Sequence, residues 1–427
     1  MHAGIQQHLR HNFVVNVLDG AFFGAAFGFA SKVAVIPLFI ATLTDSTTII
    51  GLIASLQMIG WQLPQLLTAN YVAGLHRYKR AVLIMSIHER APFLGLALVA
   101  AAYPVLGPSV TLALAFLLLV WQALGGGLTA TAWQAMICKI MPPGRRGTFY
   151  GTQSAASGLG ESLCVVIAGI LLGAEPQATD FAICFLLASI AMVLSFIFLA
   201  KTREPAIAPT QHADRDWRRF MARLRAILAR DTNVRWFLVA RVLAQFAGMS
   251  VAFYAIYAVR AFDITAETAG LLAGVLTTAQ MLASPLLGVF GDHWGHRRAM
   301  GIGILLASCS ALLVMTATGL GAFYIAFALA GVGNAALWTT VMTITADFGT
   351  LEERPYYIGL TNTLVAPATL IAPLLGGWLA DTISFQATFL VSGISGVLAT
   401  FVLMAIMHDP RQTHHTNLAA PEPVGLD

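Results

Sequence analysis

The chain has 427 residues, of which 58% are hydrophobic and only 10% are charged, whereas an average soluble domain has about 25% charged residues. Together with a mean hydropathy of +0.76, this composition excludes a soluble multidomain enzyme. The pI of about 9.0 is compatible with a nucleic-acid partner, but the net charge of +4 is spread over loops and fits membrane topology better. We therefore expect no nucleic-acid partner.

Neither the cysteines nor the N-terminus indicates secretion or redox chemistry. The first eleven residues lack the short apolar region and small-residue cleavage site of a signal peptide, so the first apolar run is expected to stay in the membrane. The cysteines lie inside apolar runs and should pack as small hydrophobic residues, without disulfides, metal or cofactor. They are Cys138, Cys164, Cys184 and Cys309.

Apolar runs of about 20 residues or more, long enough to cross a bilayer core of about 30 Å, recur twelve times along the chain. Backbone amides need partners in lipid, and no period-two alternation indicates a barrel, so each run should be a helix. The sequence predicts an all-α membrane protein with twelve transmembrane helices. The predicted spans are Phe13–Ile40, Thr47–Val72, Arg80–Tyr103, Ser109–Cys138, Gly147–Gly173, Thr179–Ala200, Val234–Val259, Ala266–Phe290, Arg298–Thr318, Gly321–Ala346, Tyr356–Ala380 and Gln386–Met407.

The basic residues predict the orientation of these spans. All but four of the 24 Lys and Arg residues fall on one side if both termini share that side. The exceptions are Arg260 in an opposite loop and Lys32, Arg90 and Arg241 within spans. The positive-inside rule then places both termini in the cytoplasm, and we expect a multi-pass protein of a bacterial inner or plasma membrane.

The two halves of the chain resemble each other. Arg146 and Gly151 recur as Arg354 and Gly359, displaced by about half the chain, and Trp133 in the fourth span has its counterpart in the tenth. Six helices per half make this a parallel repeat, which places the substrate path between the halves near the bilayer midplane. We predict six-helix bundles over 1–200 and 233–408, joined by a cytoplasmic linker over 201–232 and followed by a disordered tail over 409–427.

The second part of the linker has the pattern of an amphipathic helix. Its apolar residues recur at helical spacing with arginines on the opposite face, which suits a helix lying on the anionic cytoplasmic leaflet. A solvated tether is the equal alternative. The apolar residues are Trp217, Phe220, Leu224, Ile227 and Leu228.

The loop between the eighth and ninth spans carries a recognisable motif. Its sequence over 288–298, GVFGDHWGHRR, resembles the loop signature of the major facilitator superfamily of secondary transporters, and the resemblance extends over residues 12 to 408. It implies two six-helix bundles that work by alternating access. The corresponding loop of the first half, over 69–80, keeps the basic residues but lacks the Asp, and no subfamily signature identifies the substrate.

Asp292 is the predicted gate residue of this motif. A carboxylate at a helix end can form a charge-assisted contact in one conformation and lose it in another. The alternative is that Asp292, Arg297 and Arg298 only fix the loop and the topology. The glycines of the motif should permit close helix packing; they are Gly288, Gly291 and Gly295.

Ionisable residues inside the spans are further candidates, because each costs about 2.5–3.5 kcal/mol in hydrocarbon. Glu161 in the fifth span is the proton-coupling candidate; the alternative is a protonated Glu hydrogen-bonded to a neighbouring helix. Lys32 could bind an anionic group or pair with Glu161, or it could extend outward to the interface.

The third span contains the run His88-Glu89-Arg90, whose side chains cannot all face one side of a helix. Arg90 is expected to form a structural ion pair with Asp19, which lies at similar depth in the first span. A proton relay through His88 and the neighbouring Glu89 is an alternative function of this run.

Arg241 in the seventh span is a candidate for binding an anionic substrate, because the resemblance implies that the first and seventh spans line the cavity. Other polar and aromatic residues suit a mixed binding cavity, although each alone also serves helix packing. These candidates are Gln245, Trp133, Asn334 and Trp338.

The sequence thus predicts a monomeric, non-enzymatic secondary transporter of a small organic molecule, with protons as coupling ion, the lipid bilayer as surroundings and a weak preference for export. No Walker A run supports an ATP-driven pump. The alternatives are a transporter-like receptor or lipid translocator without proton coupling, and an intramembrane enzyme. The only residues that support an enzyme are His88 and Glu89.

Overall fold

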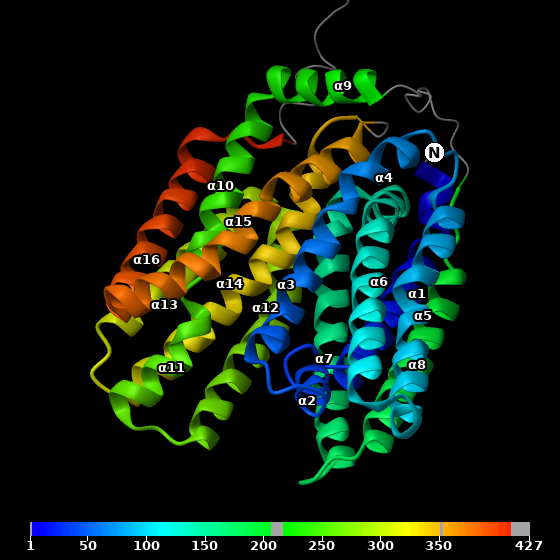
Figure 1. The fold of residues 1–427 in the computed structure, drawn as a ribbon. Coiled ribbons are helices and arrows are strands. Elements are labelled where there is room, and N and C mark those ends of the chain that lie inside the picture. The colour runs from blue at the N-terminus through cyan, green and yellow to red at the C-terminus, as the bar shows by residue number, and fades with distance from the viewer. Residues whose placement is uncertain (1, 206–216, 351–352, 411–427) are drawn as a thin grey trace, which may run out of the picture.

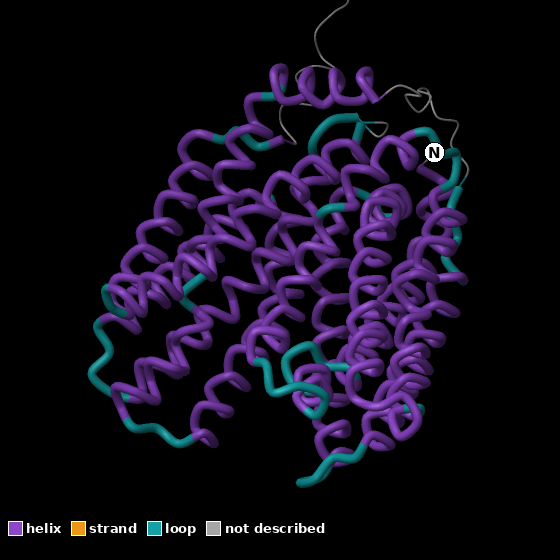
Figure 2. Tube along the Cα trace, in the orientation of Figure 1, coloured by secondary structure: helices purple, strands orange, loops and turns teal. Residues whose placement is uncertain are grey.

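The computed structural model describes residues 2–205, 217–350 and 353–410, and these residues form helices and connecting loops without a strand (Figure 2). Eleven of the helical segments are long and apolar enough to cross a membrane. The protein is therefore a multi-pass integral membrane protein of the all-α class, as predicted.

The helices of the first half pack around α1, α5 and α6, and those of the second half around α12, α13 and α14 (Figure 1). The first half contains α1 (His2–Phe29), α2 (Val35–Ala41), α3 (Thr47–Gln62), α4 (Pro64–Ala73), α5 (Tyr78–Ala101), α6 (Tyr103–Ile140), the turn η1 (Pro143–Arg145), α7 (Arg146–Leu172) and α8 (Ala178–Ala200). The second half contains α10 (Thr232–Gly248), α11 (Val251–Phe262), α12 (Ala266–Trp294), α13 (His296–Met315), α14 (Leu320–Asp347), α15 (Arg354–Thr382), α16 (Phe385–Phe401) and η2 (Val402–Ile406).

Three predicted spans are broken helices and not continuous ones. The first divides into α1 and α2 over residues 30–34, and the second divides into α3 and α4 at Leu63. A proline ring clashes with the carbonyl four residues earlier, so Pro37 and Pro64 account for these breaks. The seventh span is also divided, between α10 and α11. The first span of each half is thus interrupted at a similar place.

The predicted linker helix exists as α9 (Trp217–Arg230) and lies across one end of the bundles (Figure 1). We call this the linker end. Phe220, Leu224 and Ile227 are at most 4% exposed and join the apolar core that contains Tyr356 of α15. The amphipathic helix is therefore present, and these three residues are covered by protein, a partner that neither alternative included. Residues 206–216 and the tail from 411 lie outside the described residues.

Candidate functional site

The two halves are joined at the linker end by Asp292, near the end of α12. Its carboxylate accepts hydrogen bonds from the backbone N–H of Gly147 at 2.8 Å, and from the backbone N–H and the hydroxyl of Thr148 at 2.7 Å each. Gly147 and Thr148 begin α7, where unpaired N–H groups and the helix dipole favour a negative charge. The predicted gate residue therefore binds a helix N-terminus of the opposite half.

Glycines bring α7 and α12 close enough for this contact. A Cβ atom on Gly288 would lie 2.1 Å from the carbonyl oxygen of Gly147, and one on Gly291 would lie 2.2 Å from the His296 ring. Gly295 ends α12 with a φ of 98°, a conformation that favours glycine. Gly288 thus permits the approach of α7, Gly291 leaves room for the His296 ring, and Gly295 allows the turn.

Arg297 of the motif bonds to its own half among the described residues. Arg297 donates to the carbonyl oxygens of Leu403 and Met407, near the end of the second half, where partial negative charge favours a cation. Arg298 is exposed. These contacts hold α13 to η2, so they match the structural reading for Arg297 better than the gating one.

A related contact joins α4 and α15, the helices equivalent to α12 and α7 in the repeat. A Cβ atom on Gly359 would lie 2.9 Å from the Gln65 carbonyl oxygen, and the Tyr356 hydroxyl donates to Asn70 at 3.1 Å. Arg146 adds an ion pair with Asp347 of α14 at 3.6 Å. The linker end is therefore closed by two pseudo-symmetric helix contacts, although the first half lacks the motif Asp.

A second layer of contacts lies deeper between the bundles and uses neutral side chains. Asn362 of α15 donates to Gln65 Oε1 at 2.7 Å, and Gln62 donates to Thr369 at 3.2 Å. Next to them, the rings of Trp61 and Trp338 lie 5.8 Å apart across the two halves. Trp338 was a candidate for substrate binding, and its side chain is 51% exposed.

A buried charge cluster occupies the first half. Arg90 lies 3.3 Å from Asp19 and 3.5 Å from Glu89, and Ser195 of α8 donates to Asp19 at 2.6 Å. The predicted contact between Arg90 and Asp19 is thus present. Since these residues come from α1, α5 and α8, the cluster ties three helices of one bundle together.

Lys32 and Glu161 lie at the edge of this cluster. Lys32 interacts electrostatically with both Glu89 and Glu161, and its ammonium group lies 4.1 Å from the centre of the Phe27 ring. Glu89 is buried, and a Cβ atom on Gly126 would lie 2.9 Å from its Oε1 and 3.4 Å from Trp61. The structure therefore places Lys32 within electrostatic range of Glu89 and Glu161, with Trp61 beside Glu89.

Glu161 lies on the same face of α7 as the residues that contact α12. Gly147, Gly151 and Ser154 contact α12, and residues 158 and 161 follow them at the spacing of one helix face. Nothing lies within 4 Å of a Cβ atom on Gly158. The two helices therefore separate beyond Ser154, and Glu161 lies on the separated part.

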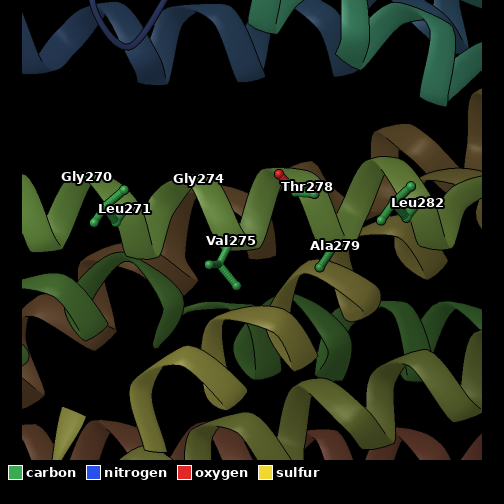
Figure 3. Close-up of a pocket in the computed structure, with 7 residues that line it drawn as sticks. All are labelled: Gly270, Leu271, Gly274, Val275, Thr278, Ala279 and Leu282. Atoms are coloured by element: carbon green, nitrogen blue, oxygen red, sulfur yellow. The ribbon is translucent and has the colours of Figure 1, made fainter. Parts of the chain in front are cut away.

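The opposing wall is an apolar hollow on α12 with a volume of about 500 Å³ (Figure 3). Thr278 supplies the only side-chain oxygen among its lining residues, which are Gly270, Leu271, Gly274, Val275, Thr278, Ala279 and Leu282. The helix contact through Ser284 lies just beyond Leu282 on the linker side. One wall of the opening is thus charged and the other is apolar.

His88 does not join these groups, which corrects the predicted relay. Its side chain is exposed on the outer face of α5, where the Trp121 indole N–H donates to its Nδ1 at 3.2 Å. Consecutive helix residues point in directions about 100° apart, so burial of Glu89 turns His88 away. No group of three or more possible metal ligands occurs among the described residues.

The remaining candidates lie in the bundle interior. Arg241 is 7% exposed and donates to α15, while Gln245 and Asn334 are half-buried. The Trp133 ring packs edge-on against Tyr150 at 5.8 Å, which is a packing role within the first half. The sequence prediction did not single out Asn362, because a lone Asn in an apolar helix carries no distinguishing pattern.

Two helical bundles are thus held together at the linker end, and the first bundle carries buried ionisable residues. A model of the Major Facilitator Superfamily matches residues 18–259 and 237–426, and the chain belongs to this superfamily.

Curated relatives include the Quinolone resistance protein NorA of Staphylococcus aureus, 22% identical over 38% of this chain and 41% of the relative. Multidrug resistance protein 2 of Bacillus subtilis is 27% identical over 33% of this chain and 36% of the relative. The chain thus spans about two fifths of the length of these relatives. A bacterial homologue of the iron transporter ferroportin, solved in an outward-facing state, matches with a TM-score of 0.75 and 14% identity over 92% of this chain and 98% of that one.

Proposed function

We propose that this protein exports a small amphipathic organic molecule in exchange for protons. The observation that carries the proposal is Glu161, which lies where α7 leaves the gate contact, within electrostatic reach of Lys32 and opposite the apolar wall of α12. The names of the two curated relatives, a quinolone resistance protein and a multidrug resistance protein, support efflux of drug-like molecules.

The linker end is the cytoplasmic end in this proposal, because the basic residues concentrate there. The structure then represents a state closed to the cytoplasm, with Glu161 facing the external side of the gate. Protonation of Glu161 removes its attraction to Lys32, and a neutral carboxyl can be enclosed between the bundles at lower cost than a charged one. The neutral carboxyl favours opening of the linker end toward the cytoplasm. Release of the proton to the cytoplasm then returns the protein to its starting state.

The gate follows from the same geometry. Asp292 and the N-terminus of α7 separate when the linker end opens, so we assign Asp292 together with its three glycines to gating. Glu89 is the second proton site, since it shares Lys32 with Glu161. Asp19 and Arg90 act as a fixed ion pair, because Ser195 of α8 is hydrogen-bonded to both of them.

Transport by reconstituted protein tests this function. A screen of thermal stability against drug-like compounds identifies ligands, because binding to the folded state raises the transition temperature. In proteoliposomes, a pH gradient should then drive uptake of the best ligand by wild type, and Glu161→Gln should abolish that dependence while ligand exchange survives. Glu175→Gln, the same change in an exposed loop residue, is the matched control. Unchanged dependence on the pH gradient in Glu161→Gln would refute the assignment.

A further inference from the structure

Arg241 of α10 is a buried cation whose described acceptors are all neutral. Its Nη1 donates to the backbone oxygen of Thr361 and to the side-chain oxygen of Asn362, both at 2.9 Å. Its Nε and Nη2 groups donate to no described residue. Its side chain is 7% exposed, so most of its contact with water is lost without an anion in exchange.

Arg90, a buried arginine of the first half, has different partners. Arg90 has two carboxylates within ion-pair distance and a hydroxyl at 2.9 Å. Taking a guanidinium out of water costs several kcal/mol unless an opposite charge compensates for it. The first half supplies such compensation to Arg90, whereas the second half leaves the guanidinium of Arg241 without a negative partner among the described residues.

The two acceptors of Arg241 connect it to the closed gate. The Asn362 side chain accepts from Arg241 through its oxygen and donates through its nitrogen to Gln65 of the opposite half. Because the oxygen is fixed by Arg241, the amide nitrogen can only point toward Gln65. Gln65 in turn donates to the backbone oxygen of Trp61, whose ring faces Trp338. Arg241 therefore orients the neutral layer that joins the bundles.

We propose that Arg241 receives an anionic group of the transported molecule, a carboxylate on a planar aromatic ring, while the linker end is open, and that Asn362 takes its place on the guanidinium when the linker end closes. The inference rests on the proposed transport function and adds the class of substrate and the step that releases it to the external side. The ring stacks on the exposed face of Trp338, and the carboxylate and Asn362 compete for the guanidinium.

The competition favours the carboxylate. A guanidinium binds a carboxylate through two parallel hydrogen bonds, each roughly twice as strong as a bond to a neutral acceptor. Asn362 then loses the partner that fixes its amide, and its bond to Gln65 is no longer held in one orientation. Since the two bundles meet through this bond, substrate binding weakens the contact between Asn362 and Gln65 on which the closed state depends.

Binding of 2-naphthoate and 2-naphthamide to the purified full chain in detergent tests the proposal. The two probes share a planar ring and differ in charge. We expect wild type to bind 2-naphthoate at least about tenfold more tightly, the effect of one charged hydrogen bond. The preference should disappear in Arg241→Gln, and also in Asn362→Asp, which gives Arg241 a carboxylate of its own. Thr363→Ala removes a different bond between the bundles without touching Arg241, so it should keep the preference.

Each outcome decides the matter. Equal binding of the two probes by folded wild type, or a preference for 2-naphthoate that survives in Arg241→Gln, overturns the proposal. A preference for 2-naphthoate that is lost on addition of chloride overturns the proposal as well, because the site then binds small anions in general. A preference that is lost in Thr363→Ala also overturns it, because the probes then report only a loosened contact between the bundles. Binding needs no proton gradient, so the anion site can fail while Glu161 still couples transport to protons, and the reverse holds too.

Discussion

Replacing Asp292 with Asn should open the linker end. The variant keeps the shape of the side chain but loses the negative charge that faces the start of α7, and its amide NH₂ must face N–H donors. Loss of one charge-assisted hydrogen bond costs about 1.5–3 kcal/mol, and loss of the interaction with the helix dipole adds about 0.3–1 kcal/mol. A change of about 3 kcal/mol shifts the ratio of closed to open molecules by about 100-fold.

A single cysteine at Ser154 reports this shift. Ser154 is half-buried where α7 meets Ser284 of α12, so a membrane-impermeant thiol reagent added from the linker side reaches it only in the open state. The four native cysteines are first replaced by Ala. We expect the reaction rate to rise by about 100-fold in Asp292→Asn, in proportion to the open population.

The matched control is Asp180→Asn. Asp180 accepts the backbone N–H of Gln177 at the start of α8, so it also interacts with a helix N-terminus, but within one bundle. This variant should leave the rate at Ser154 unchanged. An unchanged rate in Asp292→Asn, with the protein folded, would show that the contact with α7 does not hold the gate closed.

Three further variants test the packing around the site. Gly147→Ala places a Cβ atom 2.3 Å from the Gly288 carbonyl oxygen, so it should prevent closure and expose the same reporter cysteine; a protected cysteine would contradict this. Arg90→Leu leaves Asp19 as an unpaired buried carboxylate and should lower the free energy of unfolding by about 3–5 kcal/mol, measured by denaturation in mixed micelles, whereas an unchanged value would show that Asp19 is neutral. Phe220→Ala removes a ring that is 1% exposed and should cost about 3–5 kcal/mol; limited proteolysis should then cut within α9, and resistance equal to wild type would argue against its docking.

The fold was predictable because lipid leaves few alternatives. Length and hydropathy alone identify segments that must be helices, and the twelve predicted spans correspond to α1 to α8 and α10 to α16 once the broken helices are joined. The breaks themselves were not predicted, although Pro37 and Pro64 were visible. A proline in an apolar run is compatible with a kink as well as with a break, and packing of the surrounding helices decides between them.

The linker helix shows a limit of pattern analysis. Apolar residues at helical spacing identify a helix with one face to bury, and α9 is that helix. The pattern does not say what covers the face. The Phe220 ring lies 6.0 Å from that of Tyr356, a residue more than a hundred positions away, so the answer depended on where α15 begins.

The site was predicted in part for the same reason. Charges within apolar runs are conspicuous, so Asp19, Lys32, Glu89 and Glu161 could all be found, and the motif identified Asp292. Their partners were harder to predict, since Asp292 binds backbone N–H groups that every helix start offers. Gln65 and Asn362 could not be paired from the sequence, because one amide among many becomes informative only when the bundles meet.

The linker end is held by an outer layer of contacts around Asp292 and an inner layer around Gln65 and Asn362. The two layers differ in chemistry because they differ in depth. Near the linker end, water lowers the cost of charge, and Asp292 can hold the bundles through a contact worth about 3 kcal/mol. Deeper in the bilayer an unpaired carboxylate is too costly, and the bundles meet through amides whose hydrogen bonds are each worth about 1 kcal/mol. A ligand can exchange such neutral bonds for its own without help from the gate. It follows that the inner layer is suited to respond to the transported molecule, whereas the outer layer contributes free energy that closes the linker end in its presence.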